Sequence, residues 1–159
     1  MMPKSDVAAL SSHLGYWLRY VSNHVSREFA RKLEGQDVTV AEWVLMRELY
    51  DAEEIAPSRL AEAMGMTRGA ITKLAQRLIK KSLVNRRADP SDGRAQTLEL
   101  TAKGRKLVPK LAGLADQNDA ECFDHLTPKE WAMMMRVLKD IVERLDLIRS
   151  TPIDQSEKN

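Results

Sequence analysis

The chain has 159 residues, 43% of them hydrophobic, and its 25 Lys and Arg against 23 Asp and Glu give a formal net charge of +2. These values are ordinary for one folded domain, with or without an appendage. The single cysteine, Cys122, excludes an internal disulfide framework. No apolar run approaches the length of a membrane span and the N-terminus lacks a secretory-signal pattern, so we expect a soluble, cytoplasmic protein with no membrane partner.

Charge is distributed unevenly along the chain. Residues 67–106 hold eleven Lys and Arg against three Asp and Glu, a net charge of +8, whereas the other 119 residues hold 14 basic and 20 acidic side chains, a net −6. A basic segment on an acidic protein is typical of nucleic-acid-binding proteins. A solvated charged face would normally mix the two signs.

The first predicted element is a long helix over residues 8–33, which contain no proline and only one glycine. Its apolar residues recur every three or four positions and form a broad, aromatic stripe. We expect this stripe mainly to pack against other helices or a second subunit. Trp17, Tyr20 and His24 are also candidates for lining a small-molecule cleft that opens between domains.

The next helix start is the capping box Thr39-Val40-Ala41-Glu42, and Gly35 before it should end the first helix. This second helix is expected to extend to about Asp51. A linker then leads into the basic segment.

The segment 57–84 has the spacing of a helix-turn-helix. Ala61 is small enough for two helices to approach, and Gly65 can adopt the positive φ that ends the first of them. Thr67 is placed to cap the second helix, whose apolar stripe includes Ile71 and Leu74. The residues predicted to point away from that stripe are all hydrogen-bond donors and none is acidic, which suits a DNA major groove. They are Arg68, Thr72, Lys73, Gln76 and Arg77.

A β-hairpin is predicted next, because two strand-like runs, 84–88 and 96–100, flank a turn-rich segment with Asp92-Gly93. The second run alternates leucine with polar residues, as a half-buried strand does. Three arginines would project on the hairpin: Arg86, Arg87 and Arg94. A helix-turn-helix followed by such a hairpin is a winged helix.

The hairpin contains Asp92-Gly93-Arg94, followed by Leu98-Glu99-Leu100-Thr101 and by Ala102-Lys103-Gly104. This series resembles the wing motif of the MarR family, the multiple-antibiotic-resistance regulators, and the resemblance extends in helix order over residues 10–147. In that family the wing acid and arginine lie on the hairpin, and the arginine enters the minor groove. The resemblance assigns these roles to Asp92 and Arg94.

Two more helices should follow Thr101, a residue suited to cap the first of them. Pro109 should bend that helix rather than break it, since it lies within two turns of the start. The second begins at another capping box, Thr127-Pro128-Lys129-Glu130. Its wide apolar face, like that of the N-terminal helix, exceeds what a small winged-helix core can cover, which favours a homodimer.

We therefore expect a mostly α fold with a small β-hairpin wing. Residues 39–106 would form the winged helix-turn-helix domain, residues 1–38 and 107–150 a helical dimerisation region, and residues 151–159 a polar tail. The predicted function is that of a homodimeric regulator of transcription. It would be a ligand-responsive repressor that binds a pseudo-palindromic operator in double-stranded DNA and responds to a small aromatic effector.

The candidate DNA-binding residues are Ser58, Thr67, Arg68, Thr72, Lys73, Gln76, Arg77, Arg86, Asp92 and Arg94. The recognition-helix side chains would read base edges, and Arg94 would probe the width of the minor groove. Asp92, an acid near phosphates, is predicted to orient the side chain of Arg94 or Arg86 rather than to contact DNA.

The remaining residues favour no second kind of site. Cys122 lies beside Glu121 and Asp124, which disfavour a thiolate, so a buried structural cysteine is favoured over a redox sensor. The histidines lack metal-ligand spacing, and no nucleophile–base pair, carboxylate pair or phosphate loop indicates an enzyme. No metal or cofactor is expected. The alternative is a winged-helix protein-interaction module, which would not need three wing arginines or a recognition helix of donors alone.

Overall fold

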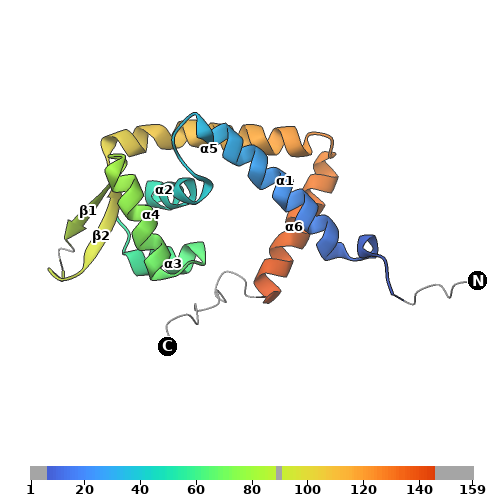
Figure 1. Ribbon diagram of the computed structural model, residues 1–159, viewed down its shortest axis with the longest axis horizontal. Helices are drawn as coiled ribbons and strands as arrows, with labels where there is room; N and C mark the ends of the chain where they lie inside the picture. Colours follow the sequence, from blue (N-terminus) through green and yellow to red (C-terminus); the bar gives the residue numbers. More distant parts are fainter. Residues whose placement is uncertain (1–6, 89–90, 146–159) are drawn as a thin grey trace, which may run out of the picture.

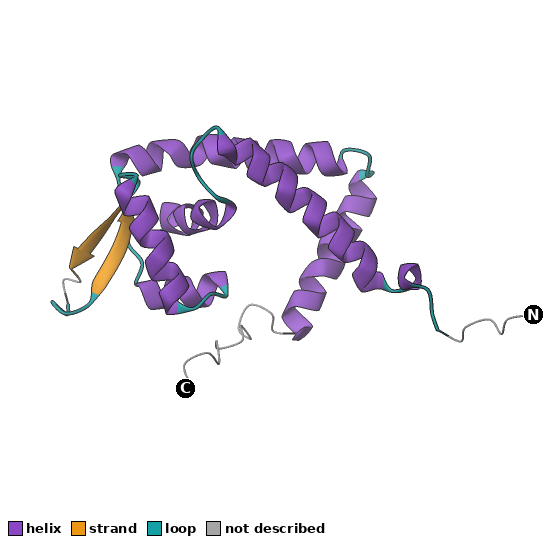
Figure 2. Ribbon diagram, in the orientation of Figure 1, coloured by secondary structure: helices purple, strands orange, loops and turns teal. Residues whose placement is uncertain are grey.

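The computed structural model describes residues 7–88 and 91–145. In chain order the elements are η1 (Leu10–Ser12), α1 (Leu14–Glu34), α2 (Val40–Asp51), α3 (Pro57–Met64), α4 (Arg68–Lys80), β1 (Val84–Ala88), β2 (Gln96–Leu100), α5 (Ala102–Phe123) and α6 (Pro128–Leu145) (Figures 1 and 2). This order confirms the mostly α fold with one antiparallel hairpin.

The long helix α5 runs along one side of the molecule, and the other elements are arranged on it (Figure 1). α1 packs against α5, and α2, α3, α4 and the hairpin form a compact head at the end where α5 begins. α6 leaves the other end of α5 and makes few contacts with the rest of the described chain. α5 is therefore a single helix that connects the head with the helical region, and it continues through Pro109.

The core lies mainly in the head. Its fully buried side chains come from every element of the head, and Leu33 of α1 with Val108 and Leu111 of α5 complete it. The members from the head include Leu45, Met46, Leu49, Leu60, Ile71, Leu74, Leu78, Val84 and Leu98. Burying each such side chain contributes about 1.5–3 kcal/mol, so these apolar contacts hold the head together and attach it to α1 and α5.

α1 begins at Leu14, later than the predicted start at residue 8. The residues before it form η1, in which Ser12 Oγ donates a hydrogen bond to the Ala9 carbonyl oxygen. The indole Nε1 of Trp17 donates to the Ser11 carbonyl oxygen at 2.8 Å. Such side-chain bonds to the backbone compete with helical bonding, and the periodicity of apolar residues does not reveal them.

The turn between α3 and α4 forms as predicted. Gly65 has φ 60° and ψ 39°, the left-handed conformation that favours glycine, and the Met66 N–H donates to the Ala61 carbonyl oxygen at 2.9 Å. Thr67 Oγ1 accepts the N–H of Ala70 at 3.1 Å and so caps α4. The start and the direction of α4 are therefore fixed locally.

The hairpin is attached to the head through its second strand. β1 and β2 pair with Val84 opposite Leu100 and Ala88 opposite Gln96. On the other side of β2, Leu98 pairs with Ile55 of the α2–α3 loop, with N–O distances of 3.0 and 2.9 Å. The hairpin therefore extends from the head as a wing with a defined direction.

The first turn of α5 is pressed against the loop that leads from α4 into β1. A Cβ atom at Gly104 would overlap the carbonyl oxygen of Leu83, so this position requires glycine. Thr101 Oγ1 accepts the Gly104 N–H at 2.9 Å and donates to the Ser82 carbonyl oxygen at 2.8 Å. These contacts join the start of α5 to the segment that directly follows α4.

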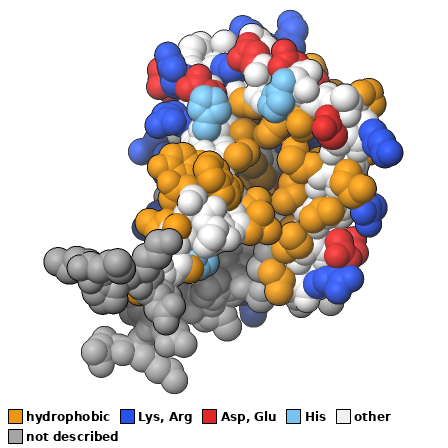
Figure 3. All heavy atoms as spheres, turned by 90° about the vertical axis from the view of Figure 1, so that its right-hand side faces the viewer, with side chains coloured by type: hydrophobic (Ala, Val, Ile, Leu, Met, Phe, Trp, Pro, Cys, Tyr) orange, Lys and Arg blue, Asp and Glu red, His pale blue; other side chains and the backbone are white. Residues whose placement is uncertain are grey.

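The helices near the two chain ends expose much apolar surface. Only Leu33 is buried in α1, and no residue is buried in α6. Trp17 is 53% exposed and Trp131 is 44% exposed, which is unusual for aromatic rings of this size. Figure 3 shows apolar side chains gathered around a hollow on this face of the molecule. Other exposed apolar residues of these helices are Leu14, Leu18, Tyr20, Val21, Met133, Val137, Leu138 and Leu145.

None of the helices in the described part of the chain combines the length and the apolar character needed to cross a membrane.

Candidate nucleic-acid interface

The recognition helix α4 presents a polar face opposite the side that is buried in the head. Arg68, Thr72, Lys73 and Gln76 are exposed on this face. Thr72 Oγ1 donates to the Arg68 carbonyl oxygen at 3.0 Å. Within the described residues, the side chains of Arg68, Lys73 and Gln76 form no hydrogen bond or ion pair. Their donor groups are therefore available to a ligand.

Arg77 was predicted to point away from the protein with these residues, and this was only partly right. Its Nε donates to Glu42 Oε1 at 3.1 Å, while 53% of the side chain stays exposed. The acceptor comes from α2, 35 positions earlier in the chain. The helical periodicity of α4 carries no information about a partner on another helix.

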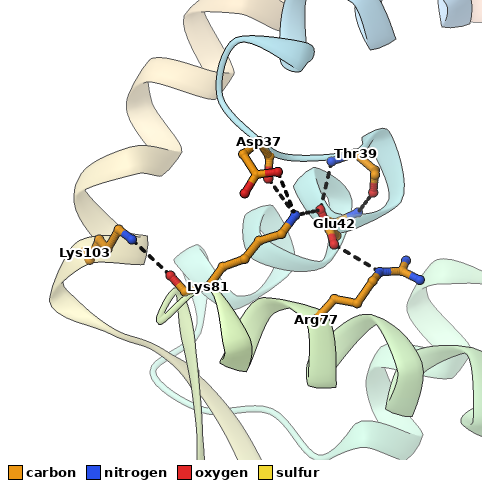
Figure 4. A network of polar contacts seen from close by, with 6 residues as sticks. All are labelled: Asp37, Thr39, Glu42, Arg77, Lys81 and Lys103. Atoms are coloured by element: carbon orange, nitrogen blue, oxygen red, sulfur yellow. Dashed lines mark hydrogen bonds and ion pairs between the residues drawn. The ribbon is translucent and has the colours of Figure 1, made fainter.

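Glu42 is a fully buried acid at the start of α2 (Figure 4). Its Oε2 accepts the Thr39 N–H at 2.9 Å and Lys81 Nζ at 3.0 Å. Burial by itself raises the pKa of this carboxyl. The hydrogen bonds from Thr39, Lys81 and Arg77 and the positive charge of Lys81 outweigh that effect, and the pKa lies below the ordinary value for glutamate. Glu42 is therefore a buried anion.

The wing carries one paired arginine and two arginines that are not paired within the described residues. Arg87 Nη1 donates to Glu99 Oε2 on the neighbouring strand at 3.2 Å. The guanidinium groups of Arg86 and Arg94 make no hydrogen bond or ion pair to the part of the chain that the structure describes, and both residues are exposed. These two cations are therefore available to an anionic partner.

Asp92 acts on the main chain of the wing. Its Oδ1 accepts the backbone N–H of Arg94 at 3.0 Å, and its carbonyl oxygen accepts the Ala95 N–H at 3.0 Å. We predicted that its carboxylate orients the side chain of Arg94 or Arg86. The contact found is instead an Asx turn, which shapes the loop from which Arg94 projects.

Arg86 lies where the wing meets α4. It lines an open groove of about 510 Å³ together with Gln76, Lys80 and Asn85. It also lines a smaller hollow of about 50 Å³ that includes Thr72. The polar face of α4 and the wing therefore form one continuous basic surface. Two further candidates, Ser58 and Thr67, are exposed near the starts of α3 and α4.

A third cavity brings together two of the three predicted ligand-binding residues. Tyr20 and His24 line an open pocket of about 510 Å³ between α1 and the α5–α6 turn. Trp17 does not line it and packs edge-on against Tyr16, with ring centroids 5.2 Å apart. The pocket lies within the helical region rather than between that region and the head. Its other lining residues are Val21, Val25, Arg27, Cys122, Phe123, His125, Leu126 and Met134.

Comparison with known proteins gives the family. Residues 38–95, which include α2, the helix-turn-helix and β1, match the sequence profile of the MarR family. The multiple antibiotic resistance protein MarR of Escherichia coli (strain K12) is 27% identical over 143 residues, covering 89% of this chain and 99% of that protein. Residues 38–95 therefore form a MarR-family domain. With this domain, and with MarR and its complex with operator DNA among the similar proteins, the chain is a DNA-binding regulator of transcription.

Several solved structures have the same fold. BpsR of Bordetella bronchiseptica, whose DNA binding is regulated by 6-hydroxynicotinic acid, matches with a TM-score of 0.78 and 23% identity, over 85% of this chain and 96% of its own. An E. coli MarR variant in complex with operator DNA matches with a TM-score of 0.76 and 26% identity, over 81% of this chain and 93% of its own.

Sequence reasoning identified Glu42 only as half of a capping box and did not single out Lys81. The local pattern Thr-x-x-Glu was the only signal for Glu42, and it says nothing about burial or about cations from α4. Likewise, the residues of the α5–α6 turn that complete the pocket beside His24 carry no local signal, since they approach α1 only through the fold.

Proposed function

We propose that the chain is a homodimeric repressor of transcription that binds a pseudo-palindromic operator. The observation that carries this proposal is the exposed face of α4, which is rich in hydrogen-bond donors and has no acid, beside Arg86 and Arg94 of the wing, which have no partner among the described residues. In helix-turn-helix proteins the second helix enters the major groove, and two such helices one duplex turn apart require a two-fold protein. The complex of the related E. coli MarR variant with operator DNA supports the same use of the fold.

The proposed contacts follow from geometry and charge. Arg68, Thr72, Lys73 and Gln76 would contact base edges, because they lie on the exposed face of α4. Arg94 would enter the minor groove from the wing. The other assigned residues would serve binding in other ways. Ser58, Thr67 and Arg86 would contact phosphates. Arg77 would contact DNA through the half of its side chain that stays exposed. Asp92 would shape the turn of the wing.

The second copy would cover the apolar faces of α1 and α6. These helices contribute little to the core of their own chain, and they expose two tryptophans, several leucines and valines, and one methionine. Apolar surface on this scale marks an interface in a regulator that needs two reading heads. The apolar side chains of the head, in contrast, are buried in a core that Leu33 of α1 and Val108 and Leu111 of α5 complete.

An effector would bind in the pocket beside Tyr20 and His24. Val25 and Phe123 offer it apolar walls, and Arg27 and His24 can donate hydrogen bonds to a carboxylate. A small aromatic acid fits this chemistry, and such a compound regulates DNA binding in the related BpsR. Binding would favour a dimer whose heads are wrongly spaced, which lowers the population that can bind DNA.

Selection of bound sequences from random duplexes tests the operator proposal. We expect a two-fold symmetric motif whose half-sites are about one duplex turn apart. Recovery of no motif, with binding that depends on duplex length alone, would refute the operator proposal and favour the protein-interaction alternative.

Fluorescence of Trp17, one helical turn from Tyr20, tests the effector proposal. Titration with aromatic carboxylates should change the fluorescence saturably, and the same compounds should release operator DNA. His24→Ala should weaken both responses without affecting DNA binding in the absence of effector. A panel of such acids that changes neither quantity would show that the pocket has no effector role.

A further inference from the structure

The polar network around Glu42 contains more hydrogen bonds than the capping of α2 requires. Figure 4 shows Glu42 receiving hydrogen bonds from the backbone N–H of Thr39, which caps α2, and from two cations, Arg77 in α4 and Lys81 directly after α4. Arg77 donates to Oε1, and Lys81 donates to Oε2. A buried carboxylate is costly unless it is paired and hydrogen-bonded, and here both oxygens have partners. The network therefore connects α2 directly with the C-terminal half of the recognition helix.

Lys81 extends the network to the turn between α1 and α2. Its Nζ also donates to the Asp37 carbonyl oxygen at 2.6 Å and lies 3.7 Å from Asp37 Oδ1. Asp37 has φ 53°, so this turn holds a left-handed residue that is not glycine. The Lys81 carbonyl oxygen in turn accepts Lys103 Nζ from the first turn of α5 at 3.0 Å. Lys81, at the end of α4, is therefore bonded both to the turn that follows α1 and to the first turn of α5.

The second capping box of the chain shows that capping alone does not explain this arrangement. Glu130 accepts the Thr127 N–H at 2.9 Å, just as Glu42 accepts that of Thr39. Glu130, however, is exposed, and no Lys or Arg is bonded to it among the described residues. A helix start of this kind therefore forms without burial and without cations. The two cations at Glu42 require a further explanation.

The position of the network on α4 supplies that explanation. The apolar face of α4 holds the helix against the head through Ile71, Leu74 and Leu78. Apolar contacts are not directional, so they fix how closely a helix packs against its neighbours better than they fix its rotation about its own axis. Arg77 and Lys81 lie on the flank toward α2, where directional, charge-assisted hydrogen bonds can fix that rotation. Gln76, adjacent to Arg77, turns with the helix.

We propose that Glu42 is a positioning residue for DNA recognition, which sets the rotation of α4 by holding Arg77 and Lys81. The inference rests on the proposed operator binding and deepens it. Because Lys81 also bonds to the α1–α2 turn, the same network conveys the position of α1 to the base-reading face. Loss of the network would reduce discrimination between DNA sequences and leave the attraction of the basic surface for phosphates in place.

The test compares Glu42→Gln with Glu48→Gln, which removes the same charge from the same helix. Glu48 is exposed and has no hydrogen bond or ion pair within the described residues. Affinities for operator and for random duplex are measured by fluorescence anisotropy over a range of salt concentrations. For Glu42→Gln we expect operator affinity to fall by about tenfold, as expected when one base-edge hydrogen bond is removed, with little change for random duplex. Glu48→Gln should keep the wild-type ratio.

Two results of this comparison would overturn the proposal. One is an operator-to-random ratio for Glu42→Gln that equals that of Glu48→Gln. The other is a parallel loss of both affinities, which indicates damage to the fold or a charge effect. If Glu42→Gln does not fold, Lys81→Gln replaces it, since Lys81 is only partly buried, unlike Glu42, and Arg77 still pairs with Glu42. A selective loss of operator affinity is expected here too, and an unchanged ratio refutes the proposal.

Amide hydrogen exchange without DNA separates this inference from the proposed function. Glu42→Gln should exchange faster than wild type at residues 77–82 and 37–39 and at the same rate in the rest of α4. Unchanged exchange in both segments overturns the inference even if operator binding changes. If wild type itself does not distinguish operator from random duplex, the proposed function fails, and exchange alone then decides whether Glu42 holds α4.

Discussion

Gly104 shows how one residue fixes the junction between the head and α5. The carbonyl oxygen of Leu83 occupies the space of a Cβ at this position, and a backbone atom cannot move aside as a side chain can. Gly104→Ala should therefore lower the free energy of unfolding by about 1–3 kcal/mol. Gly113→Ala in the same helix is the matched control, since its Cβ would meet nothing within 4 Å. It should be neutral or slightly stabilising.

Urea denaturation of the two glycine variants measures this difference. Equal stabilities of Gly104→Ala and Gly113→Ala would mean that the Leu83 carbonyl moves aside readily and that the junction is not rigid.

Two substitutions of Asp92 distinguish the effect of the wing's shape on DNA binding from the effect of its charge. Its Oδ1 accepts the Arg94 N–H, a bond that an asparagine can also make. Asp92→Asn should therefore bind DNA at least as tightly as wild type, because it keeps the turn and removes a negative charge near phosphates. Asp92→Ala should bind more weakly, because the turn loses its acceptor. Anisotropy titrations with operator DNA compare the three proteins. Tighter binding by Asp92→Ala than by wild type would show that the acid is merely repulsive.

At the scale of residues, sequence predicted the caps well and side-chain partners poorly. Thr39, Thr67 and Gly65 act within four residues of themselves, so their local pattern contains the answer. The partner of Arg77 lies on another helix, and only the packed fold brings the two together. The bond from Asp92 to the main chain was equally local, but a charge-based argument favoured a side-chain partner instead.

At the scale of elements, the recognition helix and the wing should contribute differently to binding. Gln76 on α4 is proposed to contact a base edge, and Arg94 on the wing meets a groove with a degenerate hydrogen-bonding pattern. Gln76→Ala should lose about 1–3 kcal/mol for operator DNA and little for random duplex. Arg94→Ala should weaken both and lower the salt slope by about one unit for each phosphate-like interaction that a subunit no longer makes.

Salt-dependent titrations of both variants, with operator and with random duplex, test this division. A selective loss of operator binding in Arg94→Ala, with an unchanged salt slope, would show that the wing reads sequence directly.

The elements themselves were largely predictable from sequence. Gly65, the two capping boxes and the Asp-Gly turn marked most boundaries, because each is a strong local preference. The start of α1 was not predictable, since the bond from Trp17 to Ser11 holds the preceding residues in η1. The pocket beside His24 could be anticipated only from the α1 side, because its other wall comes from the α5–α6 turn.

At the scale of the whole molecule, α1 and α6 expose more apolar surface than is usual for an isolated chain. Leu138 is 38% exposed and Trp131 is 44% exposed, although both lie on the apolar side of α6. We therefore expect wild type to sediment at micromolar concentration with twice the 18.0 kDa mass of one chain. Leu138→Glu places a charge in the proposed interface and should shift the protein toward the monomer.

The DNA-binding consequence of that substitution decides whether the dimer is functional. Leu138 belongs to α6, outside the buried core of the head, so any effect on operator affinity must act through assembly. One head reads only one half-site, so Leu138→Glu should lose most of the operator affinity. Lys139→Glu, a charge change at the next, exposed residue of α6, should stay dimeric and bind nearly as wild type does. A monomeric Leu138→Glu protein that binds a palindrome with full affinity would contradict the two-fold arrangement, since one head would then suffice.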